Sequence, residues 1–200
     1  MFAEQSLQLH FTDWMRAFTP KNKNCYTPAM TLTIRKAELK DAAQIAKMHV
    51  ETWQIAYRGH IPEDYLNKLS VEERTQKWIG ILSSQKNKNL TFLALDENEV
   101  LGFCSVGPTE DKRLSKITGE LHALYVHPSK HRQGLGSALM KTGVDKLIKQ
   151  GFKKAIVWVL KSNKSALQFY ETAGWKADGK NRKDKRGKVT LEDIRLGMDL

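Results

Sequence analysis

The sequence predicts a mixed α/β fold in which one central sheet is flanked by helices. Segments with strand periodicity and segments with helix periodicity alternate along the chain, an order typical of this class. Two neighbouring strand-like segments, 90–95 and 100–106, are joined by the polar turn 96–99 and predict an antiparallel hairpin. Between Ile117 and Leu160 a strand, a loop, a helix and an apolar strand follow one another, which predicts a right-handed parallel crossover. We therefore expect a sheet with both parallel and antiparallel pairs.

A strand and three helices precede the hairpin. Residues 31–36 alternate in polarity, with Leu32 and Ile34 on one side, and predict the first strand. Asp41 and Gln44 have the spacing of a capping box, and the helix that they open carries one apolar face: Ala42, Ile45, Ala46, His49, Trp53, Ala56 and Tyr57. A short helix follows around Tyr65 and Leu66. A second capping box, 70–73, opens a helix whose apolar side is Trp78, Ile81 and Leu82.

The second half of the chain completes the sheet. Its predicted elements are, in order, strand 117–126, helix 134–150, strand 155–160, helix 163–173, and the strands 175–177 and 191–200. Gly151 and Gly174 mark the ends of the two helices. The continuous apolar run of 155–160 predicts a strand that is buried on both faces. We expect the last two strands to be joined by a basic loop and to offer an edge for a homodimer.

Size and composition fit one domain. The chain has 200 residues, 40% of them hydrophobic, and the recognisable periodicity begins at Leu32. We expect residues 31–200 to form the domain and residues 1–30 to be a poorly ordered extension, with Met30 as an alternative start. No apolar run approaches the length of a membrane span, and the first residues do not resemble a signal peptide. The two cysteines, Cys25 and Cys104, are far apart, and Cys104 lies in an apolar strand, which predicts a free thiol and a cytoplasmic protein.

The chain is basic, with a net charge of +11. Part of this charge is local, because residues 176–188 hold seven Lys and Arg against two Asp, a balance of +5. The plainest interpretation is a solvated loop, and a second is attraction of a polyanionic cofactor. Nucleic acid is not an expected partner, since no aromatic residues are interleaved with the basic run and no nucleic-acid motif is present.

A glycine-bearing loop follows strand 117–126. Pro128 cannot continue a strand ladder, and Gly134 and Gly136 then open a helix. The free N–H groups of a helix start, approached over glycine, predict an anion site suited to phosphate or pyrophosphate. The dinucleotide fingerprint is excluded because Leu139 stands at its third glycine, and the P-loop pattern is absent.

The loop HRQGLG, residues 131–136, resembles the acetyl-CoA pyrophosphate loop of the GCN5-related N-acetyltransferases, the GNAT family, whose pattern is Q/R-x-x-G-x-G/A. His131 departs from this pattern at its first position. A second segment, 163–175, resembles the family's other signature, N-x-x-A-x-x-F/L-Y-x-x-x-G-F/W, in full. It follows the loop by one helix and one strand, as in that family. The resemblance extends over residues 32–200, and the region 52–62 is also similar to the first helix of bacterial members.

The resemblance implies a GNAT-like acyl-CoA N-acyltransferase fold, with a mixed, mostly antiparallel sheet that splays between strands 117–126 and 155–160. Backbone groups left unpaired by the splay would bind the pantetheine of acetyl-CoA, which is the implied cosubstrate. The cofactor-binding residues implied in this way are Leu124, Tyr125, Val126, His131, Arg132, Gln133, Gly134, Leu135, Gly136, Ser137, Asn163 and Tyr170. Asn163 also suits a helix cap, and Arg132 a solvated side chain.

Acetyl transfer to an amine needs a base, an oxyanion donor and a proton for the leaving thiolate. Tyr170 is the candidate acid, because a phenol of pKa about 10 suits a thiol of about 8.5. The alternative role is packing beside Phe169. Glu120 is the candidate base, placed by the two-residue period on the same side as His122 and Leu124. A solvated or ion-paired strand carboxylate is its alternative.

The acceptor side carries weaker signals. His122 and His49 are alternative bases, although His49 lies on an apolar face and suits a core histidine. Trp53, Tyr57 and His122 are the candidate substrate-binding residues, and the first two also suit the core. No metal-ligand cluster is evident. We expect an N-acetyltransferase that transfers acetyl directly to a primary amine in a ternary complex. A non-catalytic CoA-sensing module of the same fold is the alternative, and the amine itself is not specified by the sequence.

Overall fold

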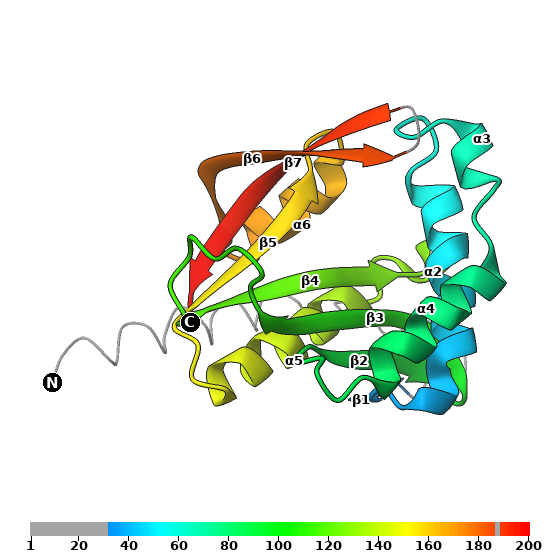
Figure 1. The fold of residues 1–200 in the computed structure, drawn as a ribbon, viewed down its shortest axis with the longest axis horizontal. Coiled ribbons are helices and arrows are strands. Elements are labelled where there is room, and N and C mark those ends of the chain that lie inside the picture. The colour runs from blue at the N-terminus through cyan, green and yellow to red at the C-terminus, as the bar shows by residue number, and fades with distance from the viewer. Residues whose placement is uncertain (1–31, 187–188) are drawn as a thin grey trace, which may run out of the picture. The chain divides into compact units, whose positions relative to one another are not determined.

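A computed structural model of the chain describes residues 32–186 and 189–200, which lie within one compact unit, residues 31–200. The extension predicted for residues 1–30 lies outside the described residues. A seven-stranded sheet forms the centre of this unit, in the order β1-β2-β3-β4-β5-β7-β6 (Figure 1). The strands are β1 (Leu32–Lys36), β2 (Leu90–Asp96), β3 (Glu99–Pro108), β4 (Thr118–Val126), β5 (Lys154–Leu160), β6 (Lys176–Arg186) and β7 (Val189–Asp199). β4 and β5 are parallel, and the other neighbours are antiparallel, so the predicted mixed sheet is confirmed.

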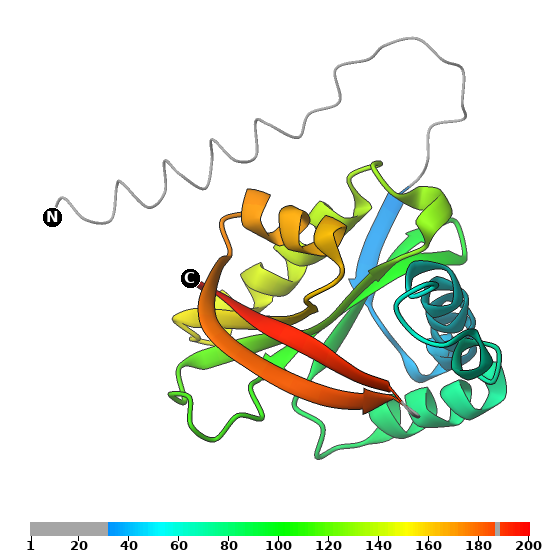
Figure 2. The ribbon, with the colours of Figure 1, turned by 90° about the horizontal axis from the view of Figure 1, so that it is seen from above.

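Helices cover both faces of the sheet (Figure 2). They are α2 (Ala42–Ala56), α3 (Glu63–Leu66), α4 (Val71–Ser83), α5 (Leu135–Lys149) and α6 (Lys164–Thr172), with short 3-10 turns η1 (Leu39–Asp41) and η2 (Pro128–Lys130). Two neighbours on β3 show how the faces divide. Phe103 meets His49 of α2, with ring centroids 5.2 Å apart, whereas Cys104 lies against Gly143 of α5. Successive strand residues point to opposite faces, so α2 and α5 lie on opposite sides.

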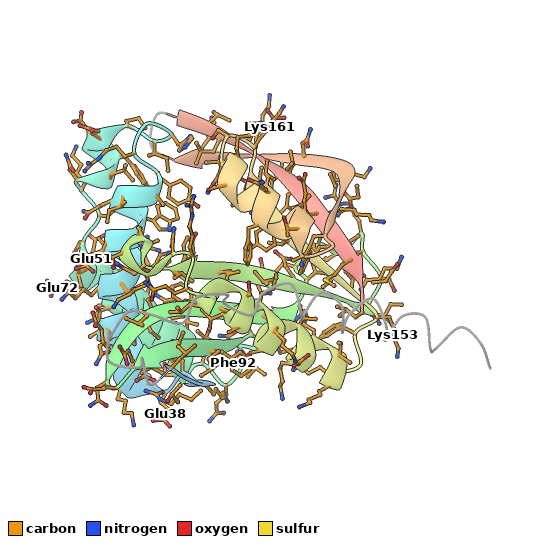
Figure 3. All side chains as sticks on the ribbon, turned by 180° about the vertical axis from the view of Figure 1, so that it is seen from behind. Glu38, Glu51, Glu72, Phe92, Lys153 and Lys161 are labelled. Atoms are coloured by element: carbon orange, nitrogen blue, oxygen red, sulfur yellow. The ribbon has the colours of Figure 1, made fainter. Side chains whose placement is uncertain are left out.

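The core under α2 and α4 is built from their predicted apolar faces. On α2 the side chains of Ala42, Ile45 and Ala46 are buried against β2 and β3. On α4 Trp78 is buried as predicted, but Ile81 is 41% exposed and Ile79 packs in its place. The polar residues of these helices, such as Glu51 and Glu72, lie on the outside (Figure 3).

Side chains cap two of the helices as the sequence predicts. Ser70 Oγ accepts from Glu73 N at the start of α4, and Asn163 Oδ1 accepts from Ala166 N at the start of α6. The predicted cap of α2 by Asp41 is wrong. The Asp41 carboxylate binds the Arg35 guanidinium at 2.7 and 2.8 Å and the Glu38 N–H at 2.8 Å, so it closes η1 instead. The Asp41 carboxylate therefore bonds to Arg35 of the preceding strand and to the Glu38 N–H, and not to the first amides of α2.

The basic segment after α6 differs from its prediction. Residues 176–186 are strand rather than loop, and they pair with β7 in a long antiparallel hairpin. Cross-strand pairs explain this: Arg182 Nε binds Asp193 Oδ2 at 3.0 Å, and the two residues are register partners. Arg182 also lies over the Trp158 ring of β5, 4.6 Å from its centroid. Pairing with β7 and β5 therefore supplies the order that low strand propensity lacks.

A bulge and a parting of strands lie at the centre of the sheet. Ser105 pairs with Ala123 but Val106 pairs with Leu121, so β4 carries one extra residue, His122, at this point. Next to the bulge, β4 and β5 separate. Only Thr118–Leu121 pair with Lys154–Val157, and beyond these four pairs the two strands diverge (Figure 1). None of the described helices is long and apolar enough to cross a membrane.

Candidate active site

The parting of β4 and β5 leaves two strand edges unpaired and facing each other. β4 stays paired with β3 as far as Val126, and β5 stays paired with β7 as far as Leu160, so the free edges are 122–126 and 158–160. The predicted cofactor residues Leu124, Tyr125 and Val126 lie on the first of these edges and are partly buried. An extended ligand that carries amide groups can bind such an edge as an added strand would.

The glycine loop continues directly from this edge. Arg132 and Gly134 both have left-handed backbone, with φ of 60° and 81°. For Arg132 this conformation is uncommon and costs about 1 kcal/mol or more, which is typical of loops shaped for a ligand. Gly134 precedes α5, and no side chain caps this helix start. The first-turn amides of Leu135, Gly136 and Ser137 are therefore directed at the solvent in front of the loop, as an anion site requires.

The side chain of His131 has a structural role that the sequence did not indicate. Its ring Nε2 lies 2.9 Å from the carbonyl oxygen of Val126, which can only accept, so the ring donates. The imidazole thus fastens the loop to the last residue of β4. At the position where the chain departs from the family pattern, the side chain supports the loop from outside, while Arg132 and Gln133 are exposed.

Tyr170 lies on the inner side of α6. It is 6% exposed and packs edge-on against Phe169 and Trp175, with ring centroids 5.2 and 5.7 Å away. Burial raises the pKa of its phenol, and the nearby Cys104 and Tyr125 raise it further. The phenol therefore faces β3 and β4 and keeps its proton at neutral pH. The packing role and the proton-donor role predicted for Tyr170 are compatible in this position.

Glu120 and His122 form a pair at the bulge. His122 Nδ1 lies 3.4 Å from Glu120 Oε1, and Thr109 Oγ1 donates to Glu120 Oε2 at 2.8 Å. His122 Nε2 lies 3.1 Å from the Pro108 carbonyl, so it carries a hydrogen. The bulge residue is thereby held against the carboxylate.

The Glu120 carboxyl is buried but ionised. Burial raises its pKa, but the His122 ring and then the Thr109 hydroxyl and the Arg182 charge outweigh burial, so the pKa lies below the ordinary 4.5. In the structure Glu120 is therefore a carboxylate with close partners on both oxygens, and not a solvated one. An ionised carboxylate at 8% exposure is also a ready proton acceptor for a group that reaches it.

The predicted shared side of Glu120 and Leu124 is wrong. Leu124 is the register partner of Cys104 and points to the α5 face, whereas Glu120 is the partner of Gly107, three residues away on β3. An odd separation on a regular strand means opposite faces. The bulge at His122 shifts the two-residue period of β4, so Glu120 opens to the α2 face and Leu124 to the cofactor side.

Trp53 and Tyr57 line the same face near the end of α2. Their ring centroids are 4.8 Å apart, and they share an apolar cluster with Tyr125 of β4 and Leu191 of β7. This cluster connects α2 with both halves of the parted sheet. Burial, followed by a hydrogen bond and the charge of Tyr125, raises the pKa of the Tyr57 phenol. His49 lies deeper, among the rings of Trp53, Trp78, Phe103 and Tyr125, and is a core residue.

A cavity of about 400 Å³ opens beside Glu120. Its walls come from the β3–β4 loop, β4, β5 and β6, and its residues are Glu110, Asp111, Lys112, Arg113, Glu120, Trp158, Asn181 and Arg182. The sequence missed Trp158 and Arg182, because one was assigned to a strand buried on both faces and the other to a loop. Strand periodicity alone was a usable signal for Trp158: it is two residues beyond Ile156, the partner of Glu120, and so shares its face.

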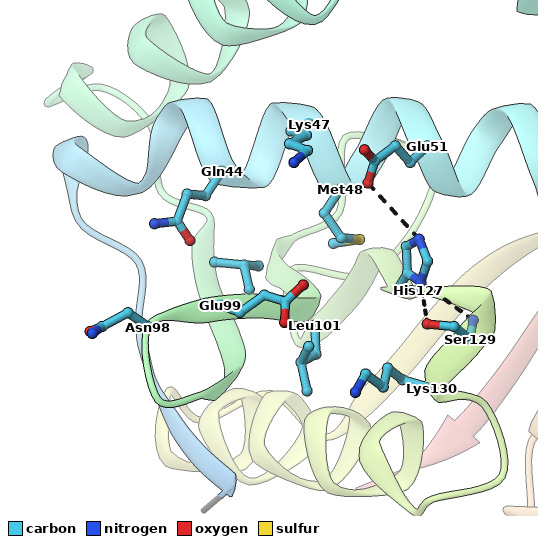
Figure 4. Close-up of a pocket in the computed structure, with 11 residues that line it drawn as sticks. Gln44, Lys47, Met48, Glu51, Asn98, Glu99, Leu101, His127, Ser129 and Lys130 are labelled. Carbon is cyan, nitrogen blue, oxygen red and sulfur yellow. Dashed lines mark hydrogen bonds and ion pairs between the residues drawn. The ribbon is translucent and has the colours of Figure 1, made fainter. Parts of the chain in front are cut away.

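A second cavity, of about 450 Å³, lies between α2, the β2–β3 turn and η2 (Figure 4). His127 is its central polar side chain. Its Nδ1 accepts from Ser129 N at 3.3 Å and so caps η2, and its Nε2 faces Glu51 Oε2 at 3.9 Å. Neither Tyr170 nor Glu120 is among the residues that line this cavity. Within the described residues, no three His, Cys, Asp or Glu side chains are placed to hold a metal ion.

Comparison with known proteins agrees with this geometry. Residues 45–175 match the model of the acetyltransferase (GNAT) family. The chain is 36% identical to the uncharacterized N-acetyltransferase YuaI of Bacillus subtilis over 169 residues, which cover 83% of this chain and 92% of the relative. An uncharacterized N-acetyltransferase of Archaeoglobus fulgidus is 28% identical and is matched over 89% of its length.

A solved structure shows the same fold. The PaiA N-acetyltransferase of Thermoplasma acidophilum, in complex with coenzyme A, superimposes with a TM-score of 0.67 at 20% identity, over 86% of this chain and 100% of that one. At that identity the likeness concerns the fold. The family match covers both predicted motifs, residues 131–136 and 163–175, in full. The two relatives named above are matched over 92% and 89% of their length. The chain belongs to the acetyltransferase (GNAT) family.

Proposed function

We propose that this N-acetyltransferase transfers the acetyl group of acetyl-CoA directly to a primary amine, with both substrates bound at once. Membership of the GNAT family makes acetyl-CoA the cosubstrate, and PaiA, a protein of the same fold, holds coenzyme A. The observation that carries the proposal is the parted sheet. It has an anion loop at one end, Tyr170 on one face and Glu120 on the other.

In this proposal the cofactor follows the free edge of β4. The pyrophosphate would bind the first-turn amides of α5 at Leu135–Ser137, with the charge of Arg132 nearby. The pantetheine amides would pair with the backbone of 124–126. Asn163 caps α6 through its carbonyl oxygen, and its amide group is left to contact the cofactor. The thioester would then reach the bulge, between Tyr170 and Glu120.

The chemistry has three steps in this arrangement. Glu120, directly or through one water, takes a proton from the ammonium of the acceptor, and His122 stabilises the carboxylate before that transfer. The neutral amine attacks the thioester carbon, so that the C–N bond forms and the carbonyl oxygen becomes an oxyanion. The positively charged nitrogen then loses its second proton to solvent, to which Glu120 also passes the first. When the C–S bond breaks, the Tyr170 phenol hydrogen-bonds to the sulfur and supplies its proton, which solvent later restores. The raised pKa of the phenol keeps this proton in place until the sulfur needs it.

An acetyl-cysteine intermediate has no suitable nucleophile among the described residues. Cys104 is fully buried, and burial raises the pKa of its thiol to about 12. A thiol in this state is a poor nucleophile. Its position supports direct transfer. A free buried thiol also fits the cytoplasmic location that we propose, and the open edge strand β6 is where a homodimer would pair.

Replacement of the Tyr170 hydroxyl tests the proposal. Tyr170→Phe should lower kcat about 100-fold or more, since a general acid contributes on that order, while the Kd for acetyl-CoA stays within about twofold. Tyr65→Phe removes a hydroxyl from α3 and serves as the control. Thiol release measures turnover, and calorimetry measures binding. Turnover equal to that of the unaltered enzyme would remove Tyr170 from the mechanism.

The same two measurements separate the enzyme from a non-catalytic CoA sensor. A sensor would bind acetyl-CoA in the calorimeter and release no thiol with any primary amine. An enzyme would release thiol with at least one class of amine. Intact Glu120 and Tyr170 on the two faces of the opening favour the enzyme.

A further inference from the structure

We propose that the acceptor is a small amino acid or a close analogue, whose amine reaches Glu120 and whose carboxylate binds the guanidinium of Arg182. This proposal rests on the proposed function and adds the chemical class of the second substrate. It follows from the cavity beside Glu120, from the balance of charges around it, and from the state of Arg182 in its wall.

The cavity has the size of a small-molecule site. At about 400 Å³ it lies within the range of known ligand pockets, toward the lower end. Glu120 lies at its β4 side and Arg182 at its β6 side, with the Trp158 ring of β5 between these strands. The charge of Arg182 acts on the Glu120 carboxyl, so the two groups are near each other across the cavity. An α-amino acid carries its ammonium and its carboxylate on one carbon, so it presents one charge to each of these two walls.

The charges around the cavity balance. Three acidic residues, Glu110, Asp111 and Glu120, face three basic ones, Lys112, Arg113 and Arg182. A polyamine or an aminoglycoside brings several positive charges and would meet three like charges here, which disfavours it. A simple alkyl amine would leave the Arg182 side of the cavity without a partner. A zwitterion matches both ends.

Arg182 is prepared to bind an anion. Its Nε is held by Asp193 at 3.0 Å, and its guanidinium carbon lies 4.6 Å from the centroid of the Trp158 ring. The side chain is nonetheless 48% exposed. Among residues whose side chains the structure describes, no acceptor other than Asp193 is bonded to it. A guanidinium that is fixed at Nε and stacked on an indole presents its outer nitrogens as a rigid fork suited to a carboxylate.

The other two arginines of this region are already engaged. Arg195 also lies near the Trp158 ring, at 5.6 Å, but its side chain is 8% exposed and is paired with Asp178 and Asp111. Arg113 binds Asp111 of its own loop through two hydrogen bonds, at 2.8 and 2.9 Å. These two arginines hold the β3–β4 loop and β6 in place. Arg182 is the one in the cavity wall whose geometry suits a substrate.

The experiment compares acceptors that differ only in the carboxylate. Glycine, leucine and phenylalanine are each tested against their amides, by thiol release at saturating acetyl-CoA. We expect the unaltered enzyme to favour at least one amino acid over its amide about tenfold or more in kcat/KM, because a charge-assisted bidentate contact is lost in the amide. Equal kcat/KM for every amino acid and its amide would overturn the proposal.

Variants then assign the preference to Arg182. Arg182→Gln should lower kcat/KM for the preferred amino acid about tenfold and leave its amide within about twofold, so that the preference disappears. Arg182→Lys keeps the positive charge but not the forked guanidinium. Its kcat/KM for the preferred amino acid should lie between those of the unaltered enzyme and of Arg182→Gln. Lys153→Gln removes an exposed charge outside the cavity and should leave kcat/KM unchanged for both the amino acid and its amide. Thermal unfolding checks that each variant is folded. Loss of activity toward both acceptors in equal measure would contradict the role of Arg182.

Failure of the proposed function gives a different result. If no amine releases thiol, calorimetry with the preferred test compound, leucine, in the presence of CoA still measures binding. Leucine binding that Arg182→Gln weakens would support the carboxylate site even then. Absence of binding for glycine, leucine and phenylalanine would overturn it, whether or not the protein is an enzyme.

Discussion

His49 is a buried ionisable group of the core that no described neighbour compensates. It is 8% exposed among four aromatic rings, and neither of its ring nitrogens has a hydrogen-bond partner among the described residues. Burial, followed by the positive charge of Arg74, lowers the pKa of His49 to about 3. The sequence indicated a satisfied core histidine. The structure confirms the core position but leaves the ring unsatisfied, which gives it a cost that depends on pH.

The sign of this pH dependence is set by the unfolded chain. Below pH 6.5 the unfolded histidine binds a proton that the folded one refuses until about pH 3, so stability falls as the pH drops through this window. Between pH 7 and pH 5 the loss from this one group is about 2 kcal/mol.

His49→Phe tests this at the residue scale. The variant keeps an aromatic ring and removes the titration, so its free energy of unfolding should fall about 2 kcal/mol less than that of the unaltered protein between pH 7 and pH 5. Urea unfolding at both pH values gives the comparison, and the change in packing cancels because it is the same at each pH. Parallel losses in the two proteins would show that His49 is not titrating as described.

Single residues also show how far sequence reasoning reaches. Gly134, Asn163 and Tyr170 were placed correctly because their surroundings are local: a helix start, a cap and one helix face. The face of the sheet on which Glu120 lies was predicted wrongly, because it depends on a bulge that shows only in the pairing of β4 with β3. Arg182 was missed for a similar reason, since its partners Trp158 and Asp193 lie on two other strands.

At the scale of elements, α5 packs on β3 through a glycine. A Cβ on Gly143 would lie 2.7 Å from Cys104 Sγ and 2.8 Å from Val106 Cγ1, and both neighbours are fully buried. The close approach of helix and sheet therefore depends on the missing side chain. Gly80 on α4 provides the matched case, because a Cβ there meets nothing within 4 Å.

Two alanine variants should consequently change stability in opposite directions. Gly143→Ala should lower the free energy of unfolding by about 1–3 kcal/mol, because crowding exceeds the gain in helix propensity. Gly80→Ala should raise it by about 0.5–1 kcal/mol through propensity alone. Urea unfolding of both variants is the measurement. A shift of the same sign in both would mean that α5 adjusts its distance from β3 freely.

The hairpin of β6 and β7 marks the limit of element prediction. Helices were found nearly to the residue, since period and caps lie within the segment itself. The length of β6 was not predicted, because its charged residues have low strand propensity and are ordered by partners on β7 and β5. The acceptor cavity is built on this hairpin. Its chemistry therefore became visible only with the fold.

At the scale of the whole molecule, we propose that residues 31–200 are the acetyltransferase domain. The sheet, the helices that cover it and both sequence motifs lie in this unit, and contacts divide the chain between Met30 and Thr31. The match to the family model, residues 45–175, falls inside it as well.

A shortened chain tests this boundary. A protein that starts at Met30 should unfold within about 2 °C of the full chain, a change below 1 kcal/mol at this size, and should keep its kcat/KM for acetyl-CoA. Thermal unfolding and thiol release are measured side by side for the two proteins. A large drop in either quantity would show that residues 1–29 contribute to the folded domain.

The four residue pairs between β4 and β5 make this sheet a hinged one. The strands of its two leaves, β1–β4 and β5–β7–β6, pair with each other only in the ladder of 118–121 with 154–157, and the free edges beyond it have no partner strand among the described residues. Bound acetyl-CoA would connect the two leaves. The backbone amide hydrogens of 122–126 should then exchange more slowly with solvent, whereas those of β1 should exchange at an unchanged rate. Hydrogen exchange followed by mass spectrometry measures both rates. Equal slowing in the two segments would contradict this expectation. Because the cavity beside Glu120 has walls on both leaves, we expect bound acetyl-CoA to shape it, and therefore to bind before the amine.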